Sequence, residues 1–196
     1  MVRKISRLIA FDMDGTLLDG RVIYNLGQKF GFESDIEKIS KSSRLPYIRS
    51  QRIAELLKGL AVSEFTGVVR AIPLMKGAMQ AVKQLKGKNF KVGIISDSYT
   101  LATEIVTSRR EMDFHVANTL EVKNGAFTGL LEMPLGWEKI GCPCRQSVCK
   151  RYHLIRLAKR CNVDLPNTAA VGDSKADLCM IESAGIGILF NPVKDT

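Results

Sequence analysis

The sequence lacks the long apolar run that marks a membrane-spanning protein. No stretch approaches the roughly 20 apolar residues that a helix needs to cross a bilayer. The apolar stretch nearest the start, residues 5–11, is short, contains Ser6 and Arg7, and runs directly into Asp12, which is unlike a secretory leader. We therefore expect a cytoplasmic protein with no membrane partner.

The sequence also lacks the cysteine pattern of a disulfide framework. It has five cysteines, and an odd number without an export signal favours reduced thiols. Cys142, Cys144 and Cys149 fall within eight residues. No His or Cys pair at the usual zinc-finger spacing supplies a fourth ligand, so we favour a loop of reduced thiols over a zinc site. Cys161 and Cys179 lie in helical patterns, and we expect both in the core.

Aromatic residues are scarce, with one Trp and 7% aromatics overall, whereas positive charge is plentiful. The net charge of +9 comes from Lys and Arg scattered over several predicted helices, without a basic stripe interleaved with aromatics. This pattern argues against a nucleic-acid partner. A positive field would instead draw small anionic molecules such as phosphate esters toward the protein.

Strand-like and helical patterns alternate along most of the chain. Short apolar or β-rich runs predict strands at residues 7–11, 91–96, 115–117, 168–171 and 186–190. Helical spacing predicts helices from Pro73 to about residue 87 and at 101–110, 150–161 and 175–184. Asn124-Gly125 between two alternating runs predicts a β-hairpin. The pattern indicates an α/β fold with a doubly wound parallel sheet.

Residues 19–72 differ in character, because their apolar residues recur only at helical spacing. The chain of 196 residues is long enough for one core and a modest insertion. We therefore expect a catalytic core made of residues 1–18 and 73–196, with a small helical cap, residues 19–72, inserted after the first strand.

Two carboxylates follow the first predicted strand, in Asp12-Met13-Asp14-Gly15-Thr16. The period-two geometry of a strand sends Asp12 and Asp14 past the same strand end. One carboxylate can act as a nucleophile while the other transfers protons, and a divalent cation would relieve their repulsion. Gly15 allows the backbone to approach a phosphate closely. A plain acidic turn is the alternative for this motif taken alone.

Further polar residues fall where other predicted strands end or helices begin. Ser96 and Asp97 end the second strand, where a hydroxyl and backbone amides can hold phosphoryl oxygens. Lys150 begins a helix, where a cation opposes the helix dipole and an anionic partner would explain it. Asp173 and Asp177 add two acids four residues apart, although helix capping is their structural alternative. In an open α/β sheet these positions converge at the carboxyl ends of the strands.

This ordered set, Asp12-x-Asp14-Gly15-Thr16, Ser96, Lys150 and Gly172-Asp173-x-x-x-Asp177, resembles the haloacid dehalogenase superfamily of phosphatases, near its phosphoserine phosphatase-like branch. The resemblance covers nearly the whole chain and implies a magnesium-dependent phosphomonoester hydrolase that acts through an aspartyl-phosphate on a small phosphorylated metabolite.

The resemblance also implies individual roles. Asp12 would be the nucleophile and a Mg²⁺ ligand, and Asp14 the general acid/base and a ligand through its backbone carbonyl. Asp173 would be the other carboxylate on the metal, and Asp177 would support metal-bound water. Lys150 would bind the phosphoryl group together with Ser96.

Several positions depart from that branch. Arg21 stands where a cap glutamate would meet the ammonium of phosphoserine, and it would favour a carboxylate or a second phosphate unless it is simply a solvated helix residue. Arg52 is the counterpart of a basic cap residue. Ala176 stands where asparagine is common, and Ser96-Asp97-Ser98 is similar to a phosphoserine:homoserine phosphotransferase.

These departures leave alternatives open. Phosphoserine is an analogy, and a phosphotransferase or a non-catalytic phosphometabolite-binding protein are the competing functions. The oligomeric state stays open, a homodimer included.

Overall fold

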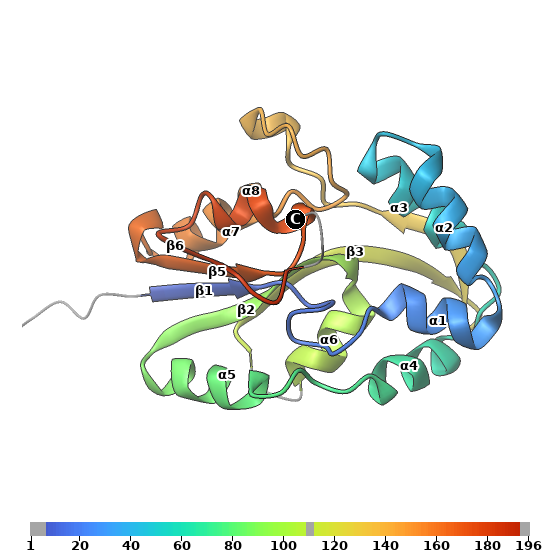
Figure 1. Ribbon diagram of the computed structural model, residues 1–196, viewed down its shortest axis with the longest axis horizontal. Coiled ribbons are helices and arrows are strands. Elements are labelled where there is room, and N and C mark those ends of the chain that lie inside the picture. The colour runs from blue at the N-terminus through green and yellow to red at the C-terminus, as the bar shows by residue number, and fades with distance from the viewer. Residues whose placement is uncertain (1–6, 109–111, 193–196) are drawn as a thin grey trace, which may run out of the picture.

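The computed structural model of the protein describes residues 7–108 and 112–192, and these contain one six-stranded sheet (Figure 1). The strand order is β4-β3-β2-β1-β5-β6, parallel throughout except for the antiparallel pair of β3 and β4. The strands are β1 (Arg7–Phe11), β2 (Phe90–Tyr99), β3 (Phe114–Lys123), β4 (Ala126–Glu132), β5 (Thr168–Gly172) and β6 (Ile186–Leu189). The predicted doubly wound α/β fold is confirmed.

Helices cover both faces of this sheet (Figure 1). One face carries α5 (Ala78–Gly87) and α6 (Thr100–Ser108), and the other carries α7 (Lys150–Arg160) and α8 (Leu178–Ile181). Strand β1 shows why two layers are needed. Ile9 and Phe11 belong to the apolar cluster on the α5/α6 side, whereas Leu8 and Ala10 belong to the cluster on the α7/α8 side. Burial on both faces accounts for the continuous apolar run of this strand.

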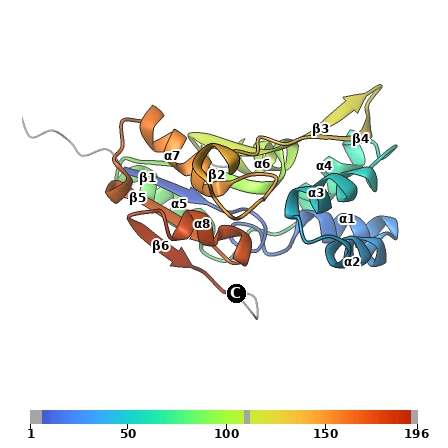
Figure 2. The ribbon, with the colours of Figure 1, turned by 90° about the horizontal axis from the view of Figure 1, so that it is seen from above.

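Four helices lie between β1 and α5 and form the insertion predicted after the first strand. They are α1 (Val22–Phe30), α2 (Glu33–Ser42), α3 (Pro46–Glu55) and α4 (Val62–Ala71), and they gather beyond one end of the sheet (Figure 2). Gly31, in the left-handed conformation at φ 82°, ends α1 and lets the chain turn into α2.

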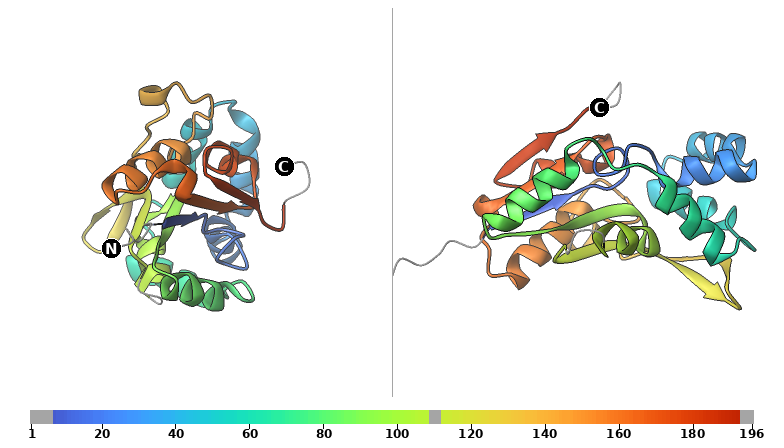
Figure 3. Two further views of the ribbon diagram at one scale, coloured as in Figure 1. Left: turned by 90° about the vertical axis from the view of Figure 1, so that its left-hand side faces the viewer. Right: turned by 90° about the horizontal axis from the view of Figure 1, so that it is seen from below.

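The β3–β4 hairpin runs out from the sheet and lies against this insertion (Figure 3). Its turn is the predicted Asn124-Gly125 pair, with φ 53° and 77°. The Gly59 N–H donates to the Phe127 carbonyl at 2.8 Å, and the ring of Phe65 on α4 packs edge-on against Phe127 with centroids 5.2 Å apart. The insertion therefore rests on a hairpin that is distant in sequence.

Two expected helices differ from the observed ones. Pro73 does not begin a helix, because Leu74 pairs with Leu18 in an antiparallel bridge and α5 begins only at Ala78. The last helix is short, with a 3₁₀ turn at Lys175–Asp177 before α8, and further 3₁₀ turns lie at Glu138–Ile140 and Leu165–Asn167. Residues 109 and 110 of the predicted helix, and residues 5 and 6 of the apolar start, lie outside the described residues.

The cysteines match expectation in part. All five are free thiols, as predicted, but Cys161 and Cys179, expected in the core, are only half-buried. Its sulfur lies with those of the loop residues Cys142, Cys144 and Cys149, so the fourth member missing from the sequence pattern comes from a distant helix. Cys161 packs at the edge of the α7/α8 cluster. Among the described residues, no helix is long and apolar enough to cross a membrane.

Candidate active site

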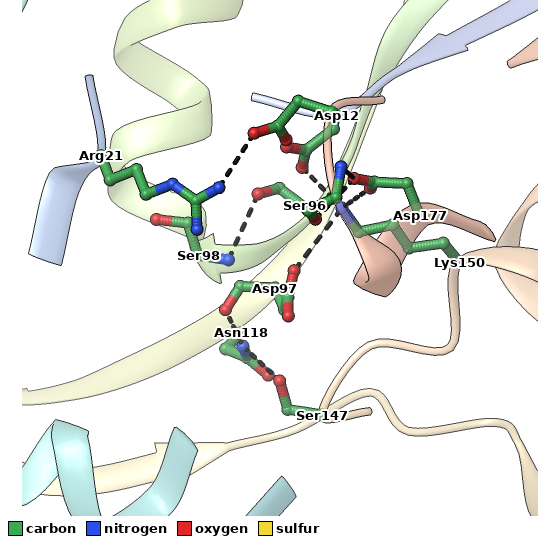
Figure 4. Close-up of polar contacts among 11 residues, drawn as sticks. Asp12, Arg21, Ser96, Asp97, Ser98, Asn118, Ser147, Lys150 and Asp177 are labelled. Atoms are coloured by element: carbon green, nitrogen blue, oxygen red, sulfur yellow. Dashed lines mark hydrogen bonds and ion pairs between the residues drawn. The ribbon is translucent and has the colours of Figure 1, made fainter. Parts of the chain in front are cut away.

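The predicted polar residues meet where β1, β2 and β5 end (Figure 4). Asp12 follows β1 directly, and its N–H donates to the Val171 carbonyl of β5 at 2.8 Å. Ser96 lies near the end of the neighbouring β2 and is 1% exposed, while Asp173 follows β5. Parallel pairing of β1 with both neighbours brings these three chain-distant residues to one edge.

Lys150 is a deeply buried cation of the site, at 1% exposure. Its Nζ lies 2.6 Å from Asp12 Oδ1, 2.5 Å from Asp177 Oδ1 and 3.5 Å from Asp97 Oδ1 (Figure 4). Burial alone would lower the pKa of Lys150, but Asp12 and Asp177 outweigh it and raise that pKa well above its usual value. The lysine is therefore a protonated cation, and these acids explain a positive charge at the start of α7.

Asp12 is buried and held in place by Lys150. Burial raises its pKa well above the usual value, while the charge of Lys150 acts in the opposite direction. A carboxylate held by one short charge-assisted bond is oriented but poorly solvated, and this favours attack on an electrophile.

Asp14 lies beside the start of the insertion. Its Oδ1 accepts a hydrogen bond of 2.9 Å from the N–H of Val22, the first residue of α1. Burial raises the pKa of Asp14 to about 6, although the Val22 N–H opposes the shift. A carboxyl with a pKa near the working pH suits proton transfer in both directions.

Three carboxylates have the donor atoms for a hard divalent cation. Single oxygens of Asp12, Asp173 and Asp177 all lie within 4.8 Å of one another, and Asp173 Oδ1 is buried with no hydrogen-bond partner. Oxygen ligands of this kind suit Mg²⁺. Gly15, at φ 85°, lies against the group, and a Cβ there would come within 2.5 Å of Asp173 Oδ2. The residues present thus fit the magnesium ion expected from the sequence.

Asp177 contacts Lys150 directly, whereas the family resemblance implied only that it would support metal-bound water. Besides binding Lys150 through Oδ1, it accepts bonds at Oδ2 from the Ser174 N–H at 2.9 Å and the Ser174 hydroxyl at 2.8 Å. Gly172 makes room for it, because a Cβ at that glycine would overlap the Asp177 side chain. Asp177 is therefore fixed on every side and positions Lys150.

The two predicted arginines lie in different surroundings. The Arg21 Nη2 pairs with Asp173 Oδ2 at 2.9 Å, and its side chain borders a cavity of about 380 Å³ above the strand ends. Arg52 is exposed, bonds Ser42 and does not border the cavity. Arg49, one helical turn earlier on α3, borders the cavity instead.

Sequence reasoning missed Asn118 and Ser147. The buried Asn118 Nδ2 donates to the Asp97 carbonyl at 2.7 Å and to Ser147 Oγ at 2.9 Å (Figure 4). This pair holds the backbone of β2 at Asp97, where the pairing register with β3 shifts, while the Ser98 N–H donates to Ser96 Oγ at 3.2 Å. Asn118 follows the third predicted strand, so the rule that placed Asp12 and Ser96 could also have found it.

Comparison with known proteins agrees with this arrangement. The family model described as haloacid dehalogenase-like hydrolase matches residues 9–182. A phosphoserine phosphatase of Methanocaldococcus jannaschii is 30% identical over 193 residues, which cover 96% of this chain and 87% of the relative. A phosphoserine phosphatase of Archaeoglobus fulgidus is 30% identical over 95% of this chain, and the chain spans about half, 53%, of that relative.

Solved structures give the same result. A structure described as a phospho-aspartyl intermediate analogue of phosphoserine phosphatase matches with a TM-score of 0.82 at 28% identity, covering 96% of this chain and 88% of that one. A substrate-bound phosphoserine phosphatase complex matches with a TM-score of 0.83 at 27% identity, covering 98% and 89%. The chain therefore belongs to the haloacid dehalogenase-like hydrolase family, in its phosphoserine phosphatase-like branch.

Proposed function

We propose that this chain is a magnesium-dependent phosphomonoester hydrolase in which Asp12 accepts the phosphoryl group. The observation that carries the proposal is the buried Asp12–Lys150 pair at the end of β1, with Asp14 two residues further on. The lysine keeps the nucleophile oriented and offers positive charge to an incoming phosphoryl group. Phosphatase activity in the relatives supports the same reading.

The reaction divides into two displacements at phosphorus. In the first, an Asp12 oxygen bonds to phosphorus, the ester oxygen departs, and Asp14 gives it a proton. In the second, Asp14 takes a proton from water as that water attacks the aspartyl-phosphate, which releases inorganic phosphate and restores Asp12. A Mg²⁺ ion held by Asp12, Asp173 and Asp177 would neutralise phosphoryl charge. Asp14 serves as acid and then base, which its pKa of about 6 suits.

The wall of the cavity supports a substrate with a second anionic group. Arg21 and Arg49 of the insertion line the cavity, and Arg21 also pairs with Asp173 of the core at 2.9 Å. Guanidinium groups bind carboxylate or phosphate in a bidentate manner. We propose a small phosphorylated carboxylic acid, with phosphoserine as the example that the relatives' names suggest.

The test is phosphate release from a panel of phosphoesters in the presence of Mg²⁺. We expect turnover in the wild type, and Asp12→Asn should lower it by at least about 10³-fold because the nucleophile is lost. Asp19→Asn, at an exposed acid of the same segment, is the matched control and should keep full activity. Equal turnover in the Asp12→Asn and Asp19→Asn variants would rule out the proposed nucleophile, and a wild type that binds phosphoesters without turnover would point to a binding protein.

A phosphotransferase is the second candidate, because Asp97 borders the cavity and lies 3.5 Å from Lys150. A carboxylate there could orient the hydroxyl or ammonium of an acceptor alcohol. Adding amino alcohols to the assay and searching for a new phosphoester by mass spectrometry separates the two functions. Inorganic phosphate as the sole phosphorylated product would exclude the phosphotransferase and support the hydrolase.

A further inference from the structure

The four-cysteine cluster lies outside the phosphoryl site and joins two separate parts of the chain. Cys142, Cys144 and Cys149 belong to the loop between β4 and α7, and Cys179 belongs to α8. The four sulfur atoms all lie within 4.8 Å of one another. A tetrahedron with zinc–sulfur bonds of about 2.3 Å places its sulfurs about 3.8 Å apart, so the cluster has the dimensions of a four-thiolate zinc site.

Two backbone turns shape the segment that carries the first two cysteines. Gly141 and Arg145 take left-handed φ values of 61° and 47° on either side of the Cys142-Pro143-Cys144 segment. The two turns bracket this segment, and the sulfurs of Cys142 and Cys144 both lie in the cluster.

The loop that carries three of the cysteines is long and has little regular secondary structure. Apart from an isolated bridge between Leu135 and Val148, residues 133–149 contain only the 3₁₀ turn Glu138–Ile140. Loops of more than about 12–15 residues without regular structure are uncommon in compact domains unless something holds them. Cys142 and Cys149 are nevertheless buried, and the Cys149 N–H donates to the Leu135 carbonyl at 3.1 Å. A metal bound to all four sulfurs would hold this loop in place.

The cluster also adjoins the catalytic residues in sequence. Cys149 precedes Lys150, Cys179 follows Asp177 by two residues, and Ser147 of the same loop holds Asn118. The Lys150–Asp177 contact therefore joins the two segments that the cysteines also join. A metal ion bound to the four cysteines would therefore fix Lys150 relative to Asp177.

We propose that Cys142, Cys144, Cys149 and Cys179 bind one zinc ion that fastens the loop before α7 to α8. Four protein ligands leave no open position, so the ion is structural and takes no part in phosphoryl transfer. The ligands are soft thiolates, which select zinc over magnesium. The proposal does not depend on the proposed hydrolase activity.

The experiment measures the metal content of the full chain purified under reducing conditions from zinc-supplemented medium. We expect about one zinc per chain in the wild type and in Cys161→Ser, which removes a half-buried cysteine outside the cluster, and a loss of most of it in Cys179→Ser. Asp12→Asn should keep its zinc, so failure of the proposed chemistry and failure of the zinc site give different results.

A second measurement covers the case in which Cys179→Ser does not fold. Replacing zinc by Co²⁺ in the wild type should produce intense thiolate-to-cobalt charge-transfer absorption with a tetrahedral ligand-field spectrum, and a competing chelator should abolish it and lower the Tm. The proposal is overturned by reduced wild type without zinc or a cobalt spectrum, by iron in its place, by disulfides among these cysteines in the purified chain, or by equal zinc in Cys179→Ser and Cys161→Ser.

Discussion

Two clusters have the donor atoms of a metal site: the carboxylates of Asp12, Asp173 and Asp177, and the four cysteines. They differ in the side chains that surround them. A lysine and an arginine already pair with the carboxylates, and Asp12 lines a cavity. The four cysteine sulfurs lie within 4.8 Å of one another, and no ion pair among the described residues involves them. The first cluster is built to exchange ligands during a reaction, and the second to close around one ion.

Removing weakly bound metal should separate the two clusters most sharply. Desalting into metal-free buffer should reduce phosphatase turnover to background, because carboxylates hold Mg²⁺ with several waters and release it readily. Added Mg²⁺ should restore turnover, while the zinc measured by elemental analysis stays with the protein throughout. Full turnover in desalted, magnesium-free protein would contradict the assignment of the carboxylate cluster.

Replacing the lysine should have the next largest effect. Lys150→Met removes the cation beside Asp12, and we expect kcat to fall about 10²–10³-fold. The buried acids lose their partner, so the free energy of unfolding should drop by about 3–5 kcal/mol. Denaturant unfolding and steady-state kinetics measure the two effects.

The matched control is Arg151→Met, which removes an exposed charge at the next position of α7. It should leave kcat and stability near the wild-type values. The zinc content of both variants should stay unchanged, and a loss in Lys150→Met alone would show that the two clusters are not independent.

The cavity wall gives a smaller effect that tests the cap. Arg49→Ala should raise KM for a phosphorylated carboxylate about tenfold, because a charged hydrogen bond contributes about 1.5–3 kcal/mol. Arg52→Ala, on the same helix but outside the cavity, should change KM less than about twofold. Equal changes in KM for the two variants, measured by initial-rate kinetics, would show that α3 does not contact the substrate.

An ion pair far from both clusters provides the smallest effect. Asp113 binds Lys86 Nζ at 2.8 Å and accepts a bond from the Val92 N–H at 2.9 Å. Asp113→Asn should lower the free energy of unfolding by about 1 kcal/mol without changing zinc content or kcat. Asp35→Asn, which breaks the exposed pair with Lys38, should cost less than about 0.5 kcal/mol.

The same residue makes stability depend on pH. Although burial raises the pKa of Asp113, hydrogen bonds from Lys86 and Val92 outweigh it and leave that pKa below the usual value. A depressed folded-state pKa gives stability that is present above the unfolded value near pH 4 and lost as pH falls through the folded value. The wild type and Asp113→Asn should therefore differ at neutral pH and converge in acid, as measured by denaturant unfolding at several pH values.

The strands, and the polar residues at their ends, were predictable from the sequence because their signals are local. Asp12 and Asp173 each follow an apolar run, and parallel pairing brings such ends together. The turn at Asn124-Gly125 was equally readable, since left-handed backbone favours these residues.

What the sequence did not reveal depends on contacts between distant segments. Cys179 joins three cysteines that lie 30 or more positions away, and a helical pattern suggested only a core residue. Arg49 borders the cavity where Arg52 was expected, because residues three apart share a helix face and the placement of α3 along its axis decides which turn reaches the site. Pro73 was misleading because its segment pairs with the chain leaving β1.

The contact between the insertion and the β3–β4 hairpin has a consequence for protein engineering. Residues 19–72 are continuous in sequence, but they pack on a hairpin that lies far away in the chain. The contacts are the Phe65–Phe127 ring packing and the Gly59–Phe127 hydrogen bond. Grafting those residues alone onto a relative would leave an apolar surface without its partner strand. The exchangeable specificity module is therefore the insertion together with residues 114–132, and chimeras that respect this boundary should retain a cooperative fold.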